Sequence, residues 1–359
     1  MNELIIDLGK RSHSILLGND TFNTIGEILC TRSVPQRVAI VTDKNIARLH
    51  LKQLSGTLCH HGFDVTEIII PAGERQKSLP RAAAVTAELL AAQITRSDAL
   101  IAFGGGVVGD VAGFVASTYR RGISFIQIPT TLLAQVESAI GGKNSVNMGG
   151  RKNVLGTFYQ PKLIFSDVSL LSTLPHREII SGLGEVLKYG YLSEEMCSFL
   201  HQHIDHILAH DADVLQETIF RCNTMKAKMI EEDECELSSF GGRSVLNLGH
   251  TIGHALENLS HYKLRHGEAV LLGLRWELEI AKNANLIDTA SAKNIESLLQ
   301  KVQYQPRLDF LTTAKLLKAV FGNNKTVRCV LPRSIGSIAI EQIDKHLVQS
   351  ALKNIKAGS

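Results

Sequence analysis

The sequence predicts an α/β domain followed by an all-α domain, and two observations indicate this division. In the first half, short β-branched runs alternate with helical segments, which is typical of a parallel sheet with helices on both faces. From residue 177 onward, apolar residues recur about every 3.6 positions, which is typical of amphipathic helices. The pattern changes at Leu174-Pro175, so we expect one domain over residues 1–174 and a helical domain over residues 175–359.

The expected elements follow from the same patterns. We expect strands at residues 4–8, 37–43, 65–70, 99–103, 125–128 and 163–167, the first of them at the sheet edge, and helices at 45–61 and 79–92. In the second half we expect helices at 196–232, 251–260, 268–284 and 289–302, then a short β-like pair at 327–331 and 337–340 and a final helix. Because ligands of open parallel sheets bind beyond the carboxyl ends of the strands, the residues that follow each strand are candidate binding residues.

Composition and charge exclude several classes of protein. The 359 residues are 44% hydrophobic and 20% charged, as in ordinary globular proteins, and a net charge of +3 is too small to indicate nucleic acid as a partner. The six cysteines form no C-x-x-C pair, which favours reduced thiols in a cytosolic protein. No signal-like N-terminus and no apolar run of membrane-spanning length occurs, so we expect a cytoplasmic protein without a membrane span.

A glycine-rich turn follows the expected strand at 99–103. The run Gly104-Gly105-Gly106-Val107-Val108-Gly109 fits the G-x-G-x-x-G pattern, in which amide groups at a helix N-terminus approach a pyrophosphate, as in Rossmann-like domains. The motif lies in a late βα unit and no acid follows about 20 residues later, so a tight packing turn is the alternative interpretation. Asp43, which ends an earlier strand, is a candidate for ribose or adenine contacts.

Two further segments combine glycine with charged residues. The turn at 71–78 carries Glu74 and Lys77, and the stretch 129–160 carries Glu137, Lys143 and Lys152 among many glycines. Many glycines beside lysines indicate backbone and ammonium groups arranged around an anion more often than they indicate a solvated loop, although such a loop would also explain the lysines. We therefore expect an anionic small molecule to bind here.

Three histidines and one acid form a candidate metal site. His250 and His254 are four residues apart, hence on one face of a helix, and His266 begins the next apolar run. Neutral imidazoles are common zinc ligands, and a catalytic zinc takes three protein ligands. With 14 histidines in the chain such a pair also arises by chance, so satisfied histidines remain the alternative. Glu185 and Lys188 lie three apart on another expected helix, where a weak surface ion pair is the simpler reading.

Nine motifs occur together in one order. They are Pro-x-Gly-Glu-x-x-Lys-Ser at 71–78, Gly-Gly-Gly-Val-Val-Gly-Asp at 104–110, Thr-Tyr-x-Arg-Gly at 118–122, Pro-Thr-Thr-Leu-Leu-Ala-Gln at 129–135, Gly-Gly-Lys at 141–143, Lys-Asn at 152–153, Gly-Leu-x-Glu-Val-x-Lys-Tyr-Gly at 182–190, Leu-Asn-x-Gly-His-Thr-x-Gly-His at 246–254 and His-Gly-Glu-Ala-Val at 266–270. In these motifs the chain resembles the 3-dehydroquinate synthase family of sugar-phosphate cyclases along nearly its whole length.

The resemblance implies a fold, a reaction and two cofactors. It implies a cytoplasmic homodimer of two-domain subunits, with NAD bound by the α/β domain and a divalent metal, Zn²⁺ or Co²⁺, bound by the helical domain. The implied reaction converts 3-deoxy-D-arabino-heptulosonate 7-phosphate to 3-dehydroquinate and phosphate in the shikimate pathway. It proceeds by transient oxidation with NAD, loss of phosphate, re-reduction and an intramolecular aldol step.

The resemblance also implies a role for particular residues. The metal ligands would be Glu185, His250 and His266. The NAD contacts would be Asp43, Asn45, Glu74, Lys77, Gly105, Gly106, Val107, Gly109, Asp110, Thr130, Thr131, Lys143, Lys152, Leu170 and Thr173. The substrate contacts would be Arg121 (lent to the neighbouring subunit), Lys143, Asn153, Lys188, Lys226, Arg243, Asn247, His254 and Lys325. The catalytic residues would be Glu236 and His254 as proton acceptors, with Glu137, Lys143 and Lys188.

The sequence departs from the family pattern at three places, which leaves alternatives. Glu137 stands where the family usually has Asp, residues 238–242 are about three longer than usual, and the loop at 323–327 is shortened around Lys325. A 2-deoxy-scyllo-inosose or 2-epi-5-epi-valiolone synthase is therefore one alternative. A metal-dependent polyol dehydrogenase, which would accumulate NADH, is another. A catalytically idle dimer that binds NAD is the third.

Overall fold

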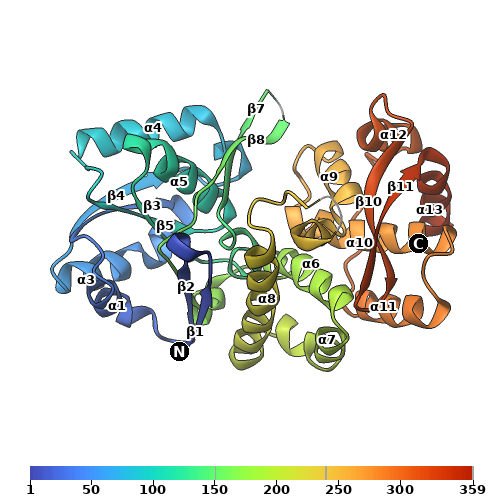
Figure 1. The fold of residues 1–359 in the computed structure, drawn as a ribbon, viewed down its shortest axis with the longest axis horizontal. Coiled ribbons are helices and arrows are strands. Elements are labelled where there is room, and N and C mark those ends of the chain that lie inside the picture. The colour runs from blue at the N-terminus through green and yellow to red at the C-terminus, as the bar shows by residue number, and fades with distance from the viewer. Residues whose placement is uncertain (150, 239–240, 358–359) are drawn as a thin grey trace. The chain divides into compact units, whose positions relative to one another are not determined.

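A computed structural model describes residues 1–149, 151–238 and 241–357, so two positions of the 238–242 segment lie outside it. The chain forms two compact units. Unit 1 contains Met1–Leu174 and Leu215–Glu231, and unit 2 contains Pro175–Val214 and the residues from Glu232 onward (Figure 1). Leu215–Glu231 lies in the half of the chain that the sequence assigns to the helical domain, yet it packs with the α/β unit.

The sheet of unit 1 has seven strands in the order β1-β2-β9-β6-β5-β3-β4. All neighbouring pairs are parallel except β1 and β2. The strands are β1 (Asn2–Ile6), β2 (His13–Gly18), β3 (Arg37–Asp43), β4 (Asp64–Ile70), β5 (Ala99–Gly104), β6 (Ser124–Pro129) and β9 (Leu163–Asp167). The parallel α/β sheet expected from the sequence is confirmed, whereas β2 was not expected. After β4 the chain returns to the other side of β3, so the strand order reverses between β3 and β5.

Helices cover both faces of this sheet, with α4 and α5 on one face and α1 and α3 on the other (Figure 1). Successive strand residues alternate between the two cores: Ala39 and Val41 face α4 and α5, while Val38 and Ile40 face α1 and α3. The helices are α1 (Ile25–Thr31), α2 (Lys44–Ile46), α3 (Lys52–His60), α4 (Leu79–Ala91) and α5 (Gly106–Thr118), and the short turns are η1 (Gly9–Arg11), η2 (Phe22–Thr24), η3 (Ala47–Leu51), η4 (Glu74–Gln76), η5 (Tyr119–Arg121), η6 (Ala134–Ser138) and η7 (Val168–Thr173).

The glycine- and lysine-rich stretch at 129–160 contains a π-helical turn, η6, and an antiparallel hairpin. The hairpin consists of β7 (Lys143–Met148) and β8 (Arg151–Phe158). Val146 anchors it in the core beside α5, and Asn144 lies so close to the helix that a Cβ on Gly113 would meet its side-chain oxygen at 1.7 Å. The alternation of exposed and half-buried residues along β8 leaves little apolar patterning, which explains why the sequence shows no strand there.

A third, smaller core of unit 1 explains why the second part of α8 (Ala212–Glu232) belongs to this unit. Ala227 and Ile230 of α8 pack against Ile6, Ile15 and Ile164 of the sheet. These residues are far apart in the sequence, so no local pattern identifies the contact. The glutamate Glu231 adds a hydrogen bond from the Asp7 backbone N–H, at 2.8 Å.

Unit 2 is helical with one antiparallel hairpin, as the sequence predicts. The helices are α6 (His176–Leu192), α7 (Glu194–Leu208), α8 (Ala212–Glu232, shared with unit 1), η8 (Gly242–Asn247), α9 (His250–Leu259), α10 (His266–Asn283), α11 (Thr289–Lys301), α12 (Thr313–Phe321) and α13 (Lys345–Ala357), and the strands are β10 (Thr326–Ser334) and β11 (Ser337–Asp344). The expected helix at 196–232 is two helices, because His210 has a φ of +61° between α7 and α8. Among the described residues, no helix has both the length and the apolar character needed to cross a bilayer.

Candidate functional site

Three helices of unit 2, α6, α9 and α10, approach one another through glycines. A Cβ on Gly184 of α6 would lie 1.9 Å from the carbonyl oxygen of Gly267 on α10, and one on Gly267 would lie 1.7 Å from that of Ser181. Between α9 and α10, a Cβ on Gly273 would lie 1.9 Å from the carbonyl oxygen of Gly249. Only glycine permits backbones this close. Gly184, Gly267 and Gly249 are sequence neighbours of the candidate metal ligands Glu185, His266 and His250, respectively.

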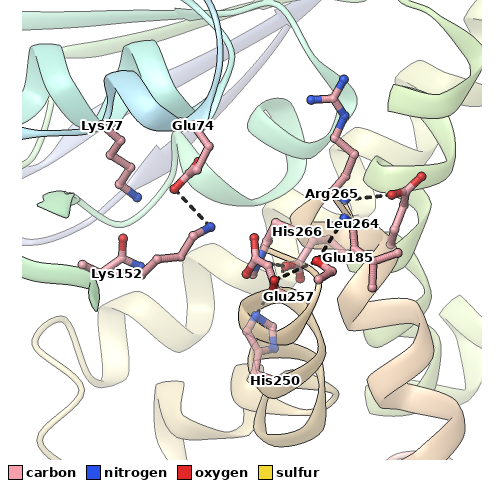
Figure 2. A network of polar contacts seen from close by, with 12 residues as sticks. Glu74, Lys77, Lys152, Glu185, His250, Glu257, Leu264, Arg265 and His266 are labelled. Carbon is pink, nitrogen blue, oxygen red and sulfur yellow. Dashed lines mark hydrogen bonds and ion pairs between the residues drawn. The ribbon is translucent and has the colours of Figure 1, made fainter. Parts of the chain in front are cut away.

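Glu185, His250 and His266 converge from these three helices. One carboxylate oxygen of Glu185, Oε1, lies 3.0 Å from Nε2 of His266 and 3.4 Å from Nε2 of His250 (Figure 2). The Glu185 side chain is fully buried, and its other oxygen lies 2.7 Å from the ammonium of Lys188. Three donor atoms that face a common point, one of them anionic, match the ligand types of a divalent zinc or cobalt site.

The two histidine rings are oriented by their second nitrogen. Nδ1 of His250 lies 3.0 Å from the carbonyl oxygen of Leu248, and Nδ1 of His266 lies 3.5 Å from a carboxylate oxygen of Glu257. In both rings an acceptor thus faces Nδ1, and Nε2 is the nitrogen that faces Glu185. Histidine ligands of metals are commonly held in this way. The residues present thus fit a divalent cation.

The charges and hydrogen bonds of the cluster favour an ionised Glu185 and a protonated His266. Burial raises the pKa of Glu185, but the charges of Lys188 and His250 and the hydrogen bonds from the two histidines lower it well below its ordinary value. Burial lowers the pKa of His266, but hydrogen bonds to Glu185 and Glu257 raise it overall to about 9. Its side chain is 30% exposed, so solvent and ions reach the ring. A cation at Nε2 would compete with this proton.

His254 completes a second arrangement of donors. The ligand atoms of His250, His254 and His266 all lie within 4.8 Å of one another, and the rings of His250 and His254 pack edge to face with centroids 5.1 Å apart. His254 is more exposed than the other two. The structure thus brings four candidate donors together, of which Glu185 is the buried one.

The other candidate residues of unit 2 lie on the segment between α8 and α9 and near β10. Asn247 donates to the carboxylate of Glu236 at 2.5 Å, and Arg243, which is buried, donates to the carbonyl oxygen of Glu234 at 2.6 Å. Glu236 has a φ of +53°, so its turn is tightly constrained. Lys325 is exposed in the turn between α12 and β10.

In unit 1, the candidate cofactor residues follow the carboxyl ends of the parallel strands. Asp43 is the last residue of β3, Gly105 follows β5, and Thr130 and Thr131 follow β6. Gly105 is the N-cap of α5, and a Cβ on it would lie 3.1 Å from Thr131. The glycine turn is therefore both a close packing contact and an open helix N-terminus, beside the point where the strand order reverses.

Two ion pairs connect this edge of the sheet. Lys77 lies 2.5 Å from the carboxylate of Asp110 on α5. Lys152 of β8 lies 3.1 Å from the carboxylate of Glu74 (Figure 2). Burial raises the pKa of Asp110, which Lys77 partly offsets. The structure thus brings four of the candidate cofactor residues together in two pairs.

Other candidates of unit 1 are already engaged within the protein. Asp43 caps α2 by accepting from the backbone N–H of Asn45 at 2.7 Å, and Thr173 bonds to His50 at 3.0 Å. Leu170 is buried in a core, so only its backbone is available to a ligand. Arg121 has a φ of +67° at the end of η5.

Glu137 and Lys226 form a pair within unit 1. The ammonium of Lys226 lies 2.7 Å from the Glu137 carboxylate and donates to the Glu137 backbone carbonyl at 2.5 Å. The lysine side chain is 3% exposed and the glutamate 20%. Lys226 is therefore a buried lysine whose ammonium has partners within the protein.

Comparison with known sequences identifies the family. A family model described as 3-dehydroquinate synthase N-terminal matches residues 67–181, and one described as 3-dehydroquinate synthase C-terminal matches residues 182–326. The chain belongs to the 3-dehydroquinate synthase family. The 3-dehydroquinate synthase of Alkaliphilus metalliredigens is 39% identical over 344 residues, covering 94% of both chains, and that of Caldanaerobacter subterraneus is 37% identical over 359 residues, covering 98% of this chain and 100% of the relative.

Solved structures of sugar-phosphate cyclases share the fold of this 3-dehydroquinate synthase family member. A 2-epi-5-epi-valiolone synthase from Streptomyces hygroscopicus with NAD⁺ and Zn²⁺ bound superposes with a TM-score of 0.89 at 23% identity, covering 97% of each chain. A 2-deoxy-scyllo-inosose synthase complexed with carbaglucose-6-phosphate, NAD⁺ and Co²⁺ has a TM-score of 0.88 at 23% identity, covering 98% of this chain and 99% of the other. A glycerol dehydrogenase from Schizosaccharomyces pombe has a TM-score of 0.67 at 16% identity, covering 96% and 88%.

Three residues of this family member carry contacts to the site but were not predicted from the sequence. Glu257 bonds to His266, Glu277 accepts from the backbone N–H of Gly249, and Asn147 bonds to Glu74. Glu257 lies seven residues after His250, on the same face of α9, which is a signal that sequence reasoning could have used. Glu277 and Asn147 reach partners 28 and 73 residues away, for which no local pattern exists.

Proposed function

We propose that the protein is a 3-dehydroquinate synthase, which converts 3-deoxy-D-arabino-heptulosonate 7-phosphate to 3-dehydroquinate and phosphate. The observation that carries this proposal is the convergence of Glu185, His250 and His266 on one point. It occurs in a chain 39% identical to a curated 3-dehydroquinate synthase over nearly its full length. Family membership indicates the reaction. The convergence of the three side chains indicates the metal centre at which the reaction would occur.

In this proposal Glu185, His250 and His266 hold a Zn²⁺ or Co²⁺ ion. A divalent ion bound there supplies Lewis acidity toward a substrate hydroxyl and the ketone formed from it. Lys188 keeps the Glu185 carboxylate ionised, and Glu257 keeps the His266 proton on Nδ1. His254, the more exposed of the clustered histidines, is the one placed to accept a proton from a ligand.

Unit 1 supplies the proposed NAD site. Bound NAD supplies reversible hydride acceptance, so none is consumed. The amides at the N-terminus of α5 would receive the pyrophosphate, and Thr130 and Thr131, which follow the adjacent strand β6, would flank it. Glu74, Lys77, Asp110 and Lys152 form the charged part of the same edge.

The remaining candidate residues suit a substrate that bears a carboxylate, a phosphate and several hydroxyls. Such a substrate requires ammonium, guanidinium and amide donors. We assign binding to Arg121, Lys143, Asn153, Lys188, Lys226, Arg243, Asn247, His254 and Lys325, and proton transfer to Glu236 and His254. Asn247 is already bonded to Glu236, which fixes the orientation of that carboxylate. Lys188 and Lys226 are buried, so their contribution is a preorganised positive potential as much as a direct contact.

We also propose that the protein is a cytoplasmic homodimer in which Arg121 serves the neighbouring subunit. The turn that carries Arg121 supports this, because it has a positive φ and leaves Arg121 exposed at the surface of unit 1. The other cyclases and the polyol dehydrogenases share the fold, so fold alone does not separate them from the proposed function.

One assay separates the proposed function from its alternatives. The purified protein is supplied with the heptulosonate phosphate, a divalent metal and NAD at a small fraction of the substrate concentration, while phosphate and NADH are followed together. We expect phosphate in large excess over NAD, with no net NADH. Stoichiometric NADH would indicate a dehydrogenase. Activity with a hexose 6-phosphate alone would indicate another cyclase, and no turnover would indicate an idle NAD-binding protein.

A further inference from the structure

Asn147 lies near the tip of the β7–β8 hairpin and makes three hydrogen bonds. Its backbone N–H donates to the carbonyl oxygen of Lys77 at 2.9 Å, and its side-chain amide donates to the Glu74 carboxylate at 3.1 Å. Its side-chain oxygen accepts from the backbone N–H of Asn153 at 3.1 Å. One residue thus joins the turn after β4 to strand β8.

The chemistry of the partners fixes the orientation of the Asn147 amide. A carboxylate only accepts, so the group that faces Glu74 must be the NH₂. A backbone N–H only donates, so the group that faces Asn153 must be the oxygen. The reverse orientation would lose both bonds. The NH₂ group therefore serves only as the donor to Glu74, and the oxygen serves only as the acceptor for Asn153.

The partners of Asn147 belong to two different binding sets. Glu74 and Lys77 are candidate NAD contacts, whereas Asn153 is a candidate substrate contact. Asn153 has a φ of +54° and its side-chain oxygen accepts from Ser145 at 3.0 Å, so both its backbone and its side chain are held. Asparagine adopts the left-handed region more readily than most residues other than glycine, and these two contacts hold Asn153 in it.

We propose that Asn147 is a positioning residue that links the NAD-binding turn to the substrate-binding residue Asn153. Its NH₂ group positions Glu74, and its oxygen positions Asn153. This proposal rests on the proposed function for the assignment of the two ligands. Asn147 itself contacts neither ligand and acts through its neighbours.

Two substitutions separate the two ends of the side chain. Asn147→Asp is isosteric and keeps an acceptor for Asn153, but it places a second carboxylate against Glu74. Asn147→Ala removes both side-chain bonds while the backbone bond to Lys77 remains. Loss of a hydrogen bond to a charged group corresponds to about a tenfold change in affinity.

The expected results differ between the two variants. For Asn147→Asp, the NAD dissociation constant, measured by calorimetry, should rise about tenfold, while the substrate KM at saturating NAD stays within about twofold. For Asn147→Ala, both constants should rise. In the double variant Glu74→Gln with Asn147→Asp, the new amide donates to the new carboxylate, so the loss of NAD affinity should be smaller than the sum of the single losses.

Thr157→Val is the matched control, because Thr157 lies in the same hairpin, on β8, and its hydroxyl donates to Ser117 at 2.9 Å, which belongs to neither candidate binding set. It should leave both constants unchanged. The proposal is overturned if Asn147→Asp raises the substrate KM as much as Asn147→Ala does, or if both variants behave like the wild type. Failure of the proposed function is recognised separately, because the wild type would then release no phosphate, whereas NAD binding is measured without turnover.

Discussion

At the scale of single residues, the departure of Glu137 from the usual Asp has a structural partner. Lys226 contacts both the carboxylate and the backbone carbonyl of Glu137, and both side chains are largely buried. Shortening the acid by one methylene withdraws the carboxylate by about 1.5 Å but leaves the carbonyl contact in place. The ammonium therefore keeps its position when the acid is shorter.

We therefore expect Glu137→Asp to retain activity, with kcat within about threefold of the wild type. Glu137→Leu instead leaves a buried ammonium without its carboxylate, and it should lower the free energy of unfolding by about 3 kcal/mol. Urea unfolding and steady-state phosphate release measure the two effects. A large loss of kcat in Glu137→Asp would show that the position of the longer acid, and not Lys226, is what the reaction requires.

The residue types at the site could be predicted because their spacing is local. His250 and His254 share a helix face, and Glu185 and Lys188 occupy adjacent positions of another helix, where the pattern predicted at most a surface ion pair. The structure instead places the second pair in the interior. The pair is buried because α9 and α10 cover α6. No residue pattern within 182–190 indicates that contact.

At the scale of elements, glycines determine how closely α6, α9 and α10 approach. The helices expected at 251–260 and 268–284 agree with α9 and α10, whereas the one expected at 196–232 is divided into α7 and α8. No local pattern pairs α6, α9 and α10, because the contacts join Gly184 to Gly267 and Gly249 to Gly273 across long separations. The hairpin β7–β8 and strand β2 escaped prediction for a related reason. Their stability comes from neighbours in the fold and not from an apolar alternation of their own.

Gly184→Ala should therefore disturb the metal centre without touching a ligand. The new methyl would lie 1.9 Å from the Gly267 carbonyl, so α6 and α10 must separate. We expect a loss of about 3 kcal/mol in unfolding free energy and at least a tenfold weaker metal affinity. Gly56→Ala in α3 is the control, because a Cβ there meets nothing within 4 Å and should leave stability equal or higher. Unchanged metal affinity in Gly184→Ala would contradict this account.

Glu277 of α10 binds the N-terminal backbone of α9 and predicts a pH effect on stability. Burial raises its pKa to about 8, although hydrogen bonds from Gly249, Ile252 and Thr251 lower it. From about pH 4.5, the ordinary value, to about pH 8, the folded protein keeps a proton that the unfolded chain has released. The contribution of Glu277 to stability is thus present at low pH and decreases as the pH rises through this window.

Comparison with Glu277→Gln isolates this effect. The unfolding free energy of the wild type, relative to that of the variant, should fall by up to about 1.4 kcal/mol per pH unit between pH 5 and 8 and level off above it. Urea unfolding at a series of pH values measures the difference. Parallel curves for the two proteins would show that the carboxyl group has the same proton affinity in the folded and unfolded chain.

At the scale of the whole molecule, the two candidate ligand sets divide between the units. Every candidate NAD contact lies within residues 43–173 of unit 1, and all three candidate metal ligands lie in unit 2. Each set is held by contacts within its own unit: Lys152 by Glu74, and His266 by Glu185 and Glu257. Such separation indicates that each ligand has an independent binding site, although turnover requires both.

This division predicts two opposite phenotypes. His266→Ala should lose the tightly bound metal while its NAD dissociation constant stays within about twofold, and Lys152→Met should raise that constant about tenfold while metal content is unchanged. Neither variant should release phosphate at the wild-type rate. His206→Ala is the control for the first, because that ring is exposed on α7 and pairs only loosely, at 3.5 Å, with Asp211. Metal analysis and calorimetry on the same preparations measure both ligands. If one substitution abolishes the binding of both, the two sites depend on each other, and the units cannot be treated as separate binding domains.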